Sequence, residues 1–148
     1  MEELPRILGL DIGTKRTGVA VSDATRFLGS PLCTIEERDP VRWVTQVLDI
    51  INKEEVGTVV VGIPLNQYGE EGRDAVRIRS YVSLLRKRTP LPVVEWDERY
   101  TTVQAERSLI SADLSRQKRK LVIDRVAATI ILQGYLDSQR GPSEEHWH

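Results

Sequence analysis

The sequence predicts an α/β protein built on a mixed five-stranded sheet with helices on both faces. Two short apolar runs separated only by Gly13-Thr14-Lys15 are typical of an antiparallel hairpin. Further along, apolar runs alternate with segments of helical periodicity, which indicates parallel strands joined by right-handed crossovers. The 148 residues, 40% of them hydrophobic, are enough for one domain. We expect this domain to span residues 1–140, with a frayed tail at 141–148.

The first half of the chain is expected to hold three strands, one helix and a fourth strand. Short turns join the first three strands, which should therefore pair antiparallel over residues 6–12, 16–22 and 28–35. Asp39 and Pro40 mark the start of a helix, as N-cap and first helical residue, and apolar residues recur at helical spacing up to Ile51. The run Val59-Val60-Val61 indicates a strand over residues 57–63 that is buried on both faces.

The second half alternates helices with one more strand. Residues 73–88 have an amphipathic pattern and residues 92–96 form an apolar run, which predicts a helix and then the fifth strand. The segment Thr101–Gln104 matches a capping box that opens a further helix. Ser115 is the expected cap of a long helix over residues 116–138.

Composition narrows the class of protein. Cys33 is the only cysteine, so no internal disulfide can form and a reducing compartment is expected, with the thiol buried in its strand. No run of 18 apolar residues is present, and the acidic start Met1-Glu2-Glu3 is unlike a signal peptide. We therefore expect a cytoplasmic protein with no membrane contact. Both histidines, His146 and His148, lie in the expected tail, which excludes a histidine-based triad in the core.

Positive charge is concentrated in two segments although the net charge is only −1. Residues 73–88 carry six basic residues against Asp74, and residues 116–125 carry five against Asp124. These six and five make 11 of the chain's 21 lysines and arginines. Segregated charge of this kind can form a basic face that attracts a phosphate backbone, or it can be two solvated helix faces.

Four acids lie where chemistry can be expected. Asp11 closes the first strand, Asp97 and Glu98 close the fifth, and Asp124 lies between apolar neighbours inside the long helix. Three of these acids could instead have a purely structural role. Asp11 could cap the hairpin turn, Asp97 could hydrogen-bond the start of the next helix, and Asp124 could pair with a neighbouring basic residue.

Taken together, the acids predict a site for divalent metal ions. In the expected sheet the first strand is central, the fourth strand pairs beside it, and the fifth strand lies on the far side of the fourth. The carboxyl ends of these three strands therefore meet at one edge of the sheet, and the long helix can cross that edge. Two ionised carboxylates about 4 Å apart repel by about 4 kcal/mol at an effective dielectric constant near 20, so the cluster must hold protons or a cation. Oxygen ligands select Mg²⁺ or Mn²⁺. A pair of such ions about 3.5–4 Å apart can activate water against a phosphodiester.

Small residues are expected on the Asp11 face of the first hairpin. Gly9 shares that face by strand alternation, and Gly18 and Ala20 lie on the next strand. A face of small residues would let a phosphate backbone approach closely, or would admit a packed helix.

Four blocks of the sequence resemble the YqgF/RuvX family, small bacterial proteins of the RNase H-like superfamily. The resemblance runs from about Ile7 to Ser138, and it rests on the order and spacing of Gly9-Leu10-Asp11-Ile12-Gly13-Thr14-Lys15, Val61-Gly62-Ile63-Pro64-Leu65-Asn66, Trp96-Asp97-Glu98-Arg99-Tyr100-Thr101-Thr102 and Asp124-Arg125-Val126-Ala127-Ala128. It implies an RNase H-like fold and nuclease activity. The family's members have been described as Holliday junction resolvases and as nucleases that process the 5′ end of pre-16S rRNA.

The resemblance also implies roles for individual residues. Asp11, Glu98 and Asp124 would be the catalytic acids that bind Mg²⁺ or Mn²⁺. Strand alternation should place only one of the adjacent acids on the Asp11 face. We assign Glu98 there and expect Asp97 to be a supporting acid that orients the turn. Contacts with nucleic acid are expected from the first hairpin turn, the loop over residues 64–69, the turn after the fifth strand and the start of the long helix: Lys15, Arg16, Asn66, Arg99, Arg116, Lys118, Arg119 and Lys120.

The implied partner is structured RNA such as pre-16S rRNA, or branched DNA, and the protein would act as a monomer or homodimer. Two other classes share parts of the pattern. Sugar kinases and actin-like ATPases also open with Asp-x-Gly-Thr and a hairpin, but they need a second phosphate loop that this chain lacks. A nucleic-acid-binding assembly factor for ribosomes without catalysis would keep the basic face and would not need the acids.

Overall fold

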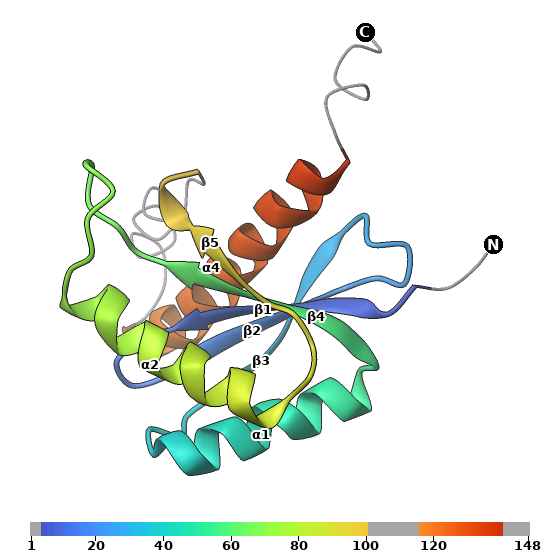
Figure 1. Ribbon diagram of the computed structural model, residues 1–148, viewed down its shortest axis with the longest axis horizontal. Helices are drawn as coiled ribbons and strands as arrows, with labels where there is room; N and C mark the ends of the chain where they lie inside the picture. Colours follow the sequence, from blue (N-terminus) through green and yellow to red (C-terminus); the bar gives the residue numbers. More distant parts are fainter. Residues whose placement is uncertain (1–3, 101–115, 141–148) are drawn as a thin grey trace, which may run out of the picture.

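The computed structural model describes residues 4–100 and 116–140, and for residues 116–124 only the backbone (Figure 1). The elements follow one another as β1 (Arg6–Ile12), β2 (Thr17–Ser22), β3 (Gly29–Ile35), α1 (Pro40–Lys53), β4 (Val56–Ile63), α2 (Arg73–Arg88), β5 (Val93–Asp97), η1 (Glu98–Tyr100) and α4 (Arg116–Gln139). The predicted capping box at Thr101–Gln104, the cap at Ser115 and the tail lie outside the described residues.

The five strands form one mixed sheet in the order β3-β2-β1-β4-β5. β1 pairs antiparallel with β2, and β2 with β3, whereas β1–β4 and β4–β5 are parallel. This confirms the predicted fold class, with β1 at the centre. Because β1, β4 and β5 run in the same direction, their carboxyl ends meet at one edge of the sheet.

The helices cover the two faces of the sheet unequally (Figure 1). α1 and α2 pack on one face, in a core cluster that includes Leu8, Leu10 and Trp43. α4 alone, among the described helices, packs on the other face, where Ile131 and Leu132 join a second cluster. None of these helices is long and apolar enough to cross a membrane.

Local signals account for the start of α1 and for its place on the sheet. Asp39 is the N-cap, and its Oδ2 accepts a hydrogen bond from the backbone N–H of Arg42 at 3.1 Å, directly before Pro40 in the first turn. Trp43 is 1% exposed, and its indole Nε1 donates to Thr17 Oγ1 at 2.9 Å. This bond joins α1 to the first residue of β2.

The small residues of the first hairpin admit a helix. A Cβ placed on Gly9 would lie 2.8 Å from Leu132 Cβ and 3.1 Å from the backbone oxygen of Ala128, both in α4. Ala20 is fully buried in the same cluster. The hypothesis that a phosphate backbone approaches the sheet at Gly9 and Ala20 is therefore wrong, because α4 occupies that space.

Several arginines of α2 bind its neighbours. Arg79 Nε donates to Glu95 Oε1 at 2.6 Å, and Arg86 NH1 lies 3.3 Å from Glu95 Oε2 on β5. Arg77 NH1 donates to the backbone oxygen of Gly13 at 3.1 Å. Much of the charge of residues 73–88 therefore fastens α2 to the sheet, on the face opposite α4.

Candidate active site

Asp11 lies at the carboxyl end of the central strand, on the face that α4 covers. Side chains alternate along a strand, so Ile7, Gly9 and Asp11 share one face. Ile7 belongs to the α4 cluster, whereas Leu8 and Leu10 belong to the core under α1 and α2. The Asp11 side chain is nearly buried, because the residue as a whole is only 5% exposed. A carboxylate held this close to an apolar layer needs a compensating charge, proton or hydrogen bond.

Glu98 reaches the same face from the turn after β5. The register pairs Leu10 with Val61 and Gly62 with Trp96, so Asp11 lies beside Gly62 in the sheet. Glu98 Cγ is 3.2 Å from the point where Gly62 would carry a Cβ. Since neighbouring strands lie about 4.8 Å apart, the two acids stand roughly one strand spacing from each other. Gly62 itself projects no side chain, and the Ile131 side chain of α4 packs above it beside Glu98.

Asp97 takes a different position from Glu98. Its Oδ1 accepts the backbone N–H of Arg99 at 2.9 Å, and its Oδ2 lies 2.6 Å from Arg99 NH2. The Arg99 guanidinium holds the pKa of the Asp97 carboxyl below its usual range. Asp97 thus shapes the turn that carries Glu98. This placement agrees with the one expected for the two acids, and their roles stay predictions.

The third predicted acid belongs to α4. The backbone at Asp124 is helical, within the helix that crosses the Asp11 face. Its side chain, like those of Arg116, Lys118, Arg119 and Lys120, lies outside the described residues. Within the part of the chain that the structure describes, no group of three or more histidine, cysteine, aspartate or glutamate side chains is close enough to hold a metal ion. Asp11 and Glu98 are the two predicted ligands that this part brings together.

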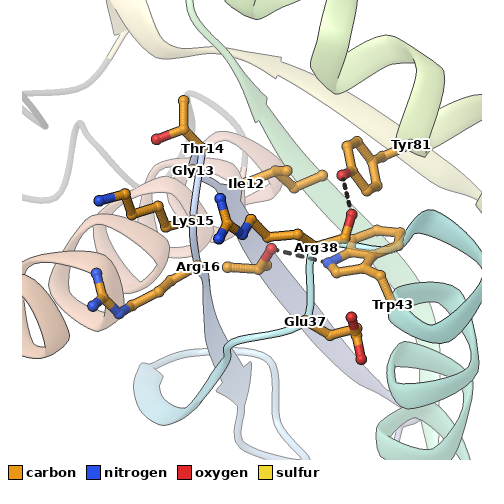
Figure 2. A pocket seen from close by; sticks show the side chains of 10 residues that line it. Ile12, Gly13, Thr14, Lys15, Arg16, Glu37, Arg38, Trp43 and Tyr81 are labelled. Atoms are coloured by element: carbon orange, nitrogen blue, oxygen red, sulfur yellow. Dashed lines mark hydrogen bonds between the residues drawn. The ribbon is translucent and has the colours of Figure 1, made fainter.

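Lys15 and Arg16 extend from the hairpin turn. Figure 2 shows both side chains pointing away from Trp43 and Tyr81, which line the other side of a small pocket at the turn. Lys15 is exposed, and Arg16 Nε donates to Glu36 Oε1 at 3.2 Å. An exposed ion pair of this kind contributes little to stability, so a phosphate can compete for Arg16.

Asn66 and Arg99 lie on neighbouring loops. Both backbone N–H groups of Tyr68 and Glu70 donate to Asn66 Oδ1 at 2.9 Å, and Asn66 Nδ2 donates to Glu70 Oε1 at 3.2 Å. Gly69 has a φ of 79°, and its Cβ position would lie 3.2 Å from Arg99 NH2. Glycine fits here because it adopts positive φ without strain and leaves room for the guanidinium. Asn66 therefore folds the loop, and Arg99 packs against it.

Sequence reasoning missed the role of Arg77. It donates to the carbonyl oxygens of Gly13 at 3.1 Å and of Ile12 at 3.4 Å, directly after Asp11. It braces the hairpin turn from the face opposite α4. No local signal distinguishes Arg77 from the other arginines of α2, because the bond joins positions 64 residues apart.

Cys33 also differs from expectation. The thiol is only half-buried, because β3 is the edge strand of the sheet. Burial still raises the pKa of the thiol, and the positive charge of Arg125 acts in the opposite direction.

A five-stranded mixed sheet with an acid at the end of its central strand and another after its last strand defines an α/β protein of the RNase H-like class. Two solved structures share this fold at 14% sequence identity. One is Thermus thermophilus RuvC in complex with a Holliday junction substrate, with a TM-score of 0.57 over 92% of this chain and 96% of that one. The other is the fowlpox virus resolvase with substrate Holliday junction DNA, with a TM-score of 0.53 over 92% and 99%.

The chain belongs to the RuvX family. The family model, described as "Holliday junction resolvase", matches residues 5–138. Similar curated proteins carry the name "Putative pre-16S rRNA nuclease". The one from Thermoanaerobacter pseudethanolicus is 45% identical over 136 residues, which cover 91% of this chain and 98% of the relative. Those from Caldanaerobacter subterraneus and Halalkalibacterium halodurans are 48% and 46% identical, with the same coverage.

Proposed function

We propose that this protein is a metal-dependent nuclease that hydrolyses phosphodiester bonds in structured RNA, in the maturation of the 5′ end of pre-16S rRNA. The observation that carries the proposal is the pairing of Asp11 and Glu98 across Gly62, on the face crossed by α4. The names of relatives 45–48% identical along nearly their whole length support the choice of substrate. Ribosome biogenesis and a cytoplasmic location follow from that substrate.

Asp11 and Glu98 fit a hard divalent cation, since both offer oxygen ligands and lie roughly one strand spacing apart on the same face. With Asp124 from α4 as a further ligand, they would hold Mg²⁺ or Mn²⁺, as two ions. Such ions activate water and stabilise the leaving oxygen of a phosphodiester. The chain's own contribution is to position the acids. β1 holds Asp11, and the Asp97–Arg99 pair sets the turn that directs Glu98 towards Gly62.

Branched DNA is the second candidate substrate. The description of the family model favours it, since that description names Holliday junctions. Symmetric cutting of a four-way junction needs two active sites, so a resolvase would act as a homodimer, whereas trimming an RNA end requires only a monomer.

The test is a cleavage assay with Mg²⁺ or Mn²⁺ on two substrates, a pre-16S rRNA 5′ leader and a four-way DNA junction. We expect the RNA to be cut, and Asp11→Asn to reduce the rate by about a thousandfold or more while salt-sensitive binding is kept. Asp49→Asn is the matched control, because Asp49 is an exposed carboxylate on α1, on the opposite face. Equal cleavage by Asp11→Asn and the parent protein would exclude the mechanism. Cutting of the junction alone would favour the resolvase.

A further inference from the structure

One hydrogen bond between side chains joins α4 to the edge strand β3 near the candidate site. Arg125 Nε donates to Thr34 Oγ1 at 3.0 Å, and the arginine is half-buried. Among the described residues, the guanidinium makes no other hydrogen bond or ion pair. Thr34 therefore fixes its Nε, and no described residue binds its two terminal amino groups.

This arginine stands at the same level of the sheet as Asp11. The register pairs Asp11 with Gly18 and Gly18 with Thr34, so the three residues form one row across β1, β2 and β3. Residues of one row point to the same face, and here that face carries α4. Two strand spacings place Thr34 about 10 Å from Asp11. Gly18, between them, projects no side chain.

The chemistry of the guanidinium decides what can bind there. The planar guanidinium can donate two parallel N–H groups to one phosphate. Because Nε is already fixed, most of the side-chain entropy that such binding would cost has already been lost. A lysine could not bond Thr34 and present a fork at the same time.

We propose that Arg125, oriented by Thr34, binds the phosphate of a nucleotide flanking the cleaved bond. This inference rests on the proposed nuclease function and adds a non-scissile phosphate site to it. A stacked strand rises about 3.4 Å per nucleotide, so about 10 Å corresponds to two or three nucleotides from the bond at Asp11. The bound nucleic-acid strand would run along this row of residues, past the carboxyl end of β1, in the direction from β3 towards β5.

The test combines a variant with a chemical change in the substrate. The cleaved bond is first mapped, and then single uncharged 2′-deoxy methylphosphonate linkages are placed at each of the three phosphates on either side. In the parent protein, we expect one linkage two or three positions from the cut to slow cleavage about 10- to 100-fold. In Arg125→Ala, the unmodified substrate should be slowed by a similar factor, and that linkage should then have no additional effect.

Further variants separate positioning from attachment. Thr34→Val, which removes the hydroxyl, should weaken the dependence on that phosphate, and Thr34→Ser should restore it. Arg140→Ala is the control, because Arg140 stacks on Phe27 and lies about 22 Å along α4 from Arg125. It should leave the response to every linkage unchanged. Thermal melting of each variant shows that only folded proteins are compared.

Additive effects of Arg125→Ala and of every linkage would overturn this inference and leave the nuclease function intact. Failure of the parent protein to cut or bind either substrate would instead reject the proposed function. Equal sensitivity to the linkages in Thr34→Val and the parent would remove Thr34 from the site.

Discussion

Asp97 and Arg99 show how the two residues that flank an acid in the chain can fix its position. The carboxylate of Asp97 accepts both the backbone N–H and the guanidinium of Arg99, and the same guanidinium packs against Gly69. The turn between them contains Glu98. A change at Asp97 should therefore act on catalysis through the direction of Glu98, as well as on stability.

The effect of Asp97 on stability depends on pH. Its folded-state pKa is depressed by Arg99, so the unfolded chain takes up the proton first as pH falls. The stabilisation is fully present above the ordinary aspartate value of about 3.9 and disappears as pH falls through the lower folded value. We expect Asp97→Asn to lower the free energy of unfolding by about 1 kcal/mol at pH 7 and by less at pH 3, where the carboxyl of the unfolded chain is already mostly protonated. Urea unfolding at both pH values measures it, and an equal loss at both would contradict the assignment.

Asn66 allows a test that separates folding of the loop from contact with nucleic acid. Its Oδ1 accepts hydrogen bonds from two backbone N–H groups. Asn66→Asp keeps these two bonds and loses only the one from Nδ2 to Glu70, whereas Asn66→Ala loses all three. We expect Asn66→Ala to speed amide hydrogen exchange at Tyr68 and Glu70 about 10-fold, and to weaken nucleic-acid binding more than Asn66→Asp does. A direct contact through Nδ2 would reverse that order, because the added carboxylate would repel the phosphates.

At the scale of the element, α4 packs against glycines of the sheet. Substitutions at two of them, Gly9 and Gly62, test the position of the helix and the position of Glu98 respectively. At Gly9 an added methyl group meets Leu132 Cβ and the backbone oxygen of Ala128, so α4 as a whole would have to shift to make room. At Gly62 it meets Ile131 Cδ1, the end of a flexible side chain, and lies 3.2 Å from Glu98 Cγ. The first glycine therefore sets the position of the helix, and the second sets that of the acid.

We expect Gly9→Ala to lower the free energy of unfolding by about 1–3 kcal/mol. Gly62→Ala should destabilise the protein less, because Ile131 can change its rotamer, and should lower the cleavage rate more than its stability loss explains. Chemical denaturation and single-turnover cleavage of both variants provide the comparison. Parallel changes in stability and rate for the two glycines would show that Gly62 has no special relation to Glu98.

The elements also show which parts of the structure a sequence can predict. Local chemistry placed the start of α1 at Asp39 and Pro40, and the alternation of strands with helices predicted the order of the sheet. Long-range packing was not accessible in this way. Gly9 suits a phosphate or a helix equally, and only the contact with Leu132 decides between them. The strand β5 runs one residue further than expected because the ladder continues to the pair Ile63 and Asp97.

At the scale of the whole molecule, the two basic segments lie on opposite faces of the sheet. α2 packs with α1 on one face, and α4 covers the face that carries Asp11 (Figure 1). The sequence alone shows excess positive charge in both segments, but it does not show which of the two attracts nucleic acid more strongly. Arg79 and Arg86 pair with Glu95, a partner on β5 that charge counting does not reveal. The candidate site should therefore draw its long-range attraction from the start of α4.

This asymmetry predicts different salt dependences for two triple variants that remove equal charge. Lys118, Arg119 and Lys120 of α4 are compared with Arg73, Lys87 and Arg88, which are exposed on α2. Each lost phosphate contact lowers the slope of log K against log salt concentration by about 0.7–0.9. Replacing the α4 set by alanine should therefore lower the slope by about 2 and weaken binding, whereas the α2 set should change the slope by less than about 0.5. Fluorescence anisotropy with a labelled RNA leader at four salt concentrations measures both slopes. Equal slopes for the two variants would show that nucleic acid responds to the charge of the whole molecule and is not guided to the α4 face.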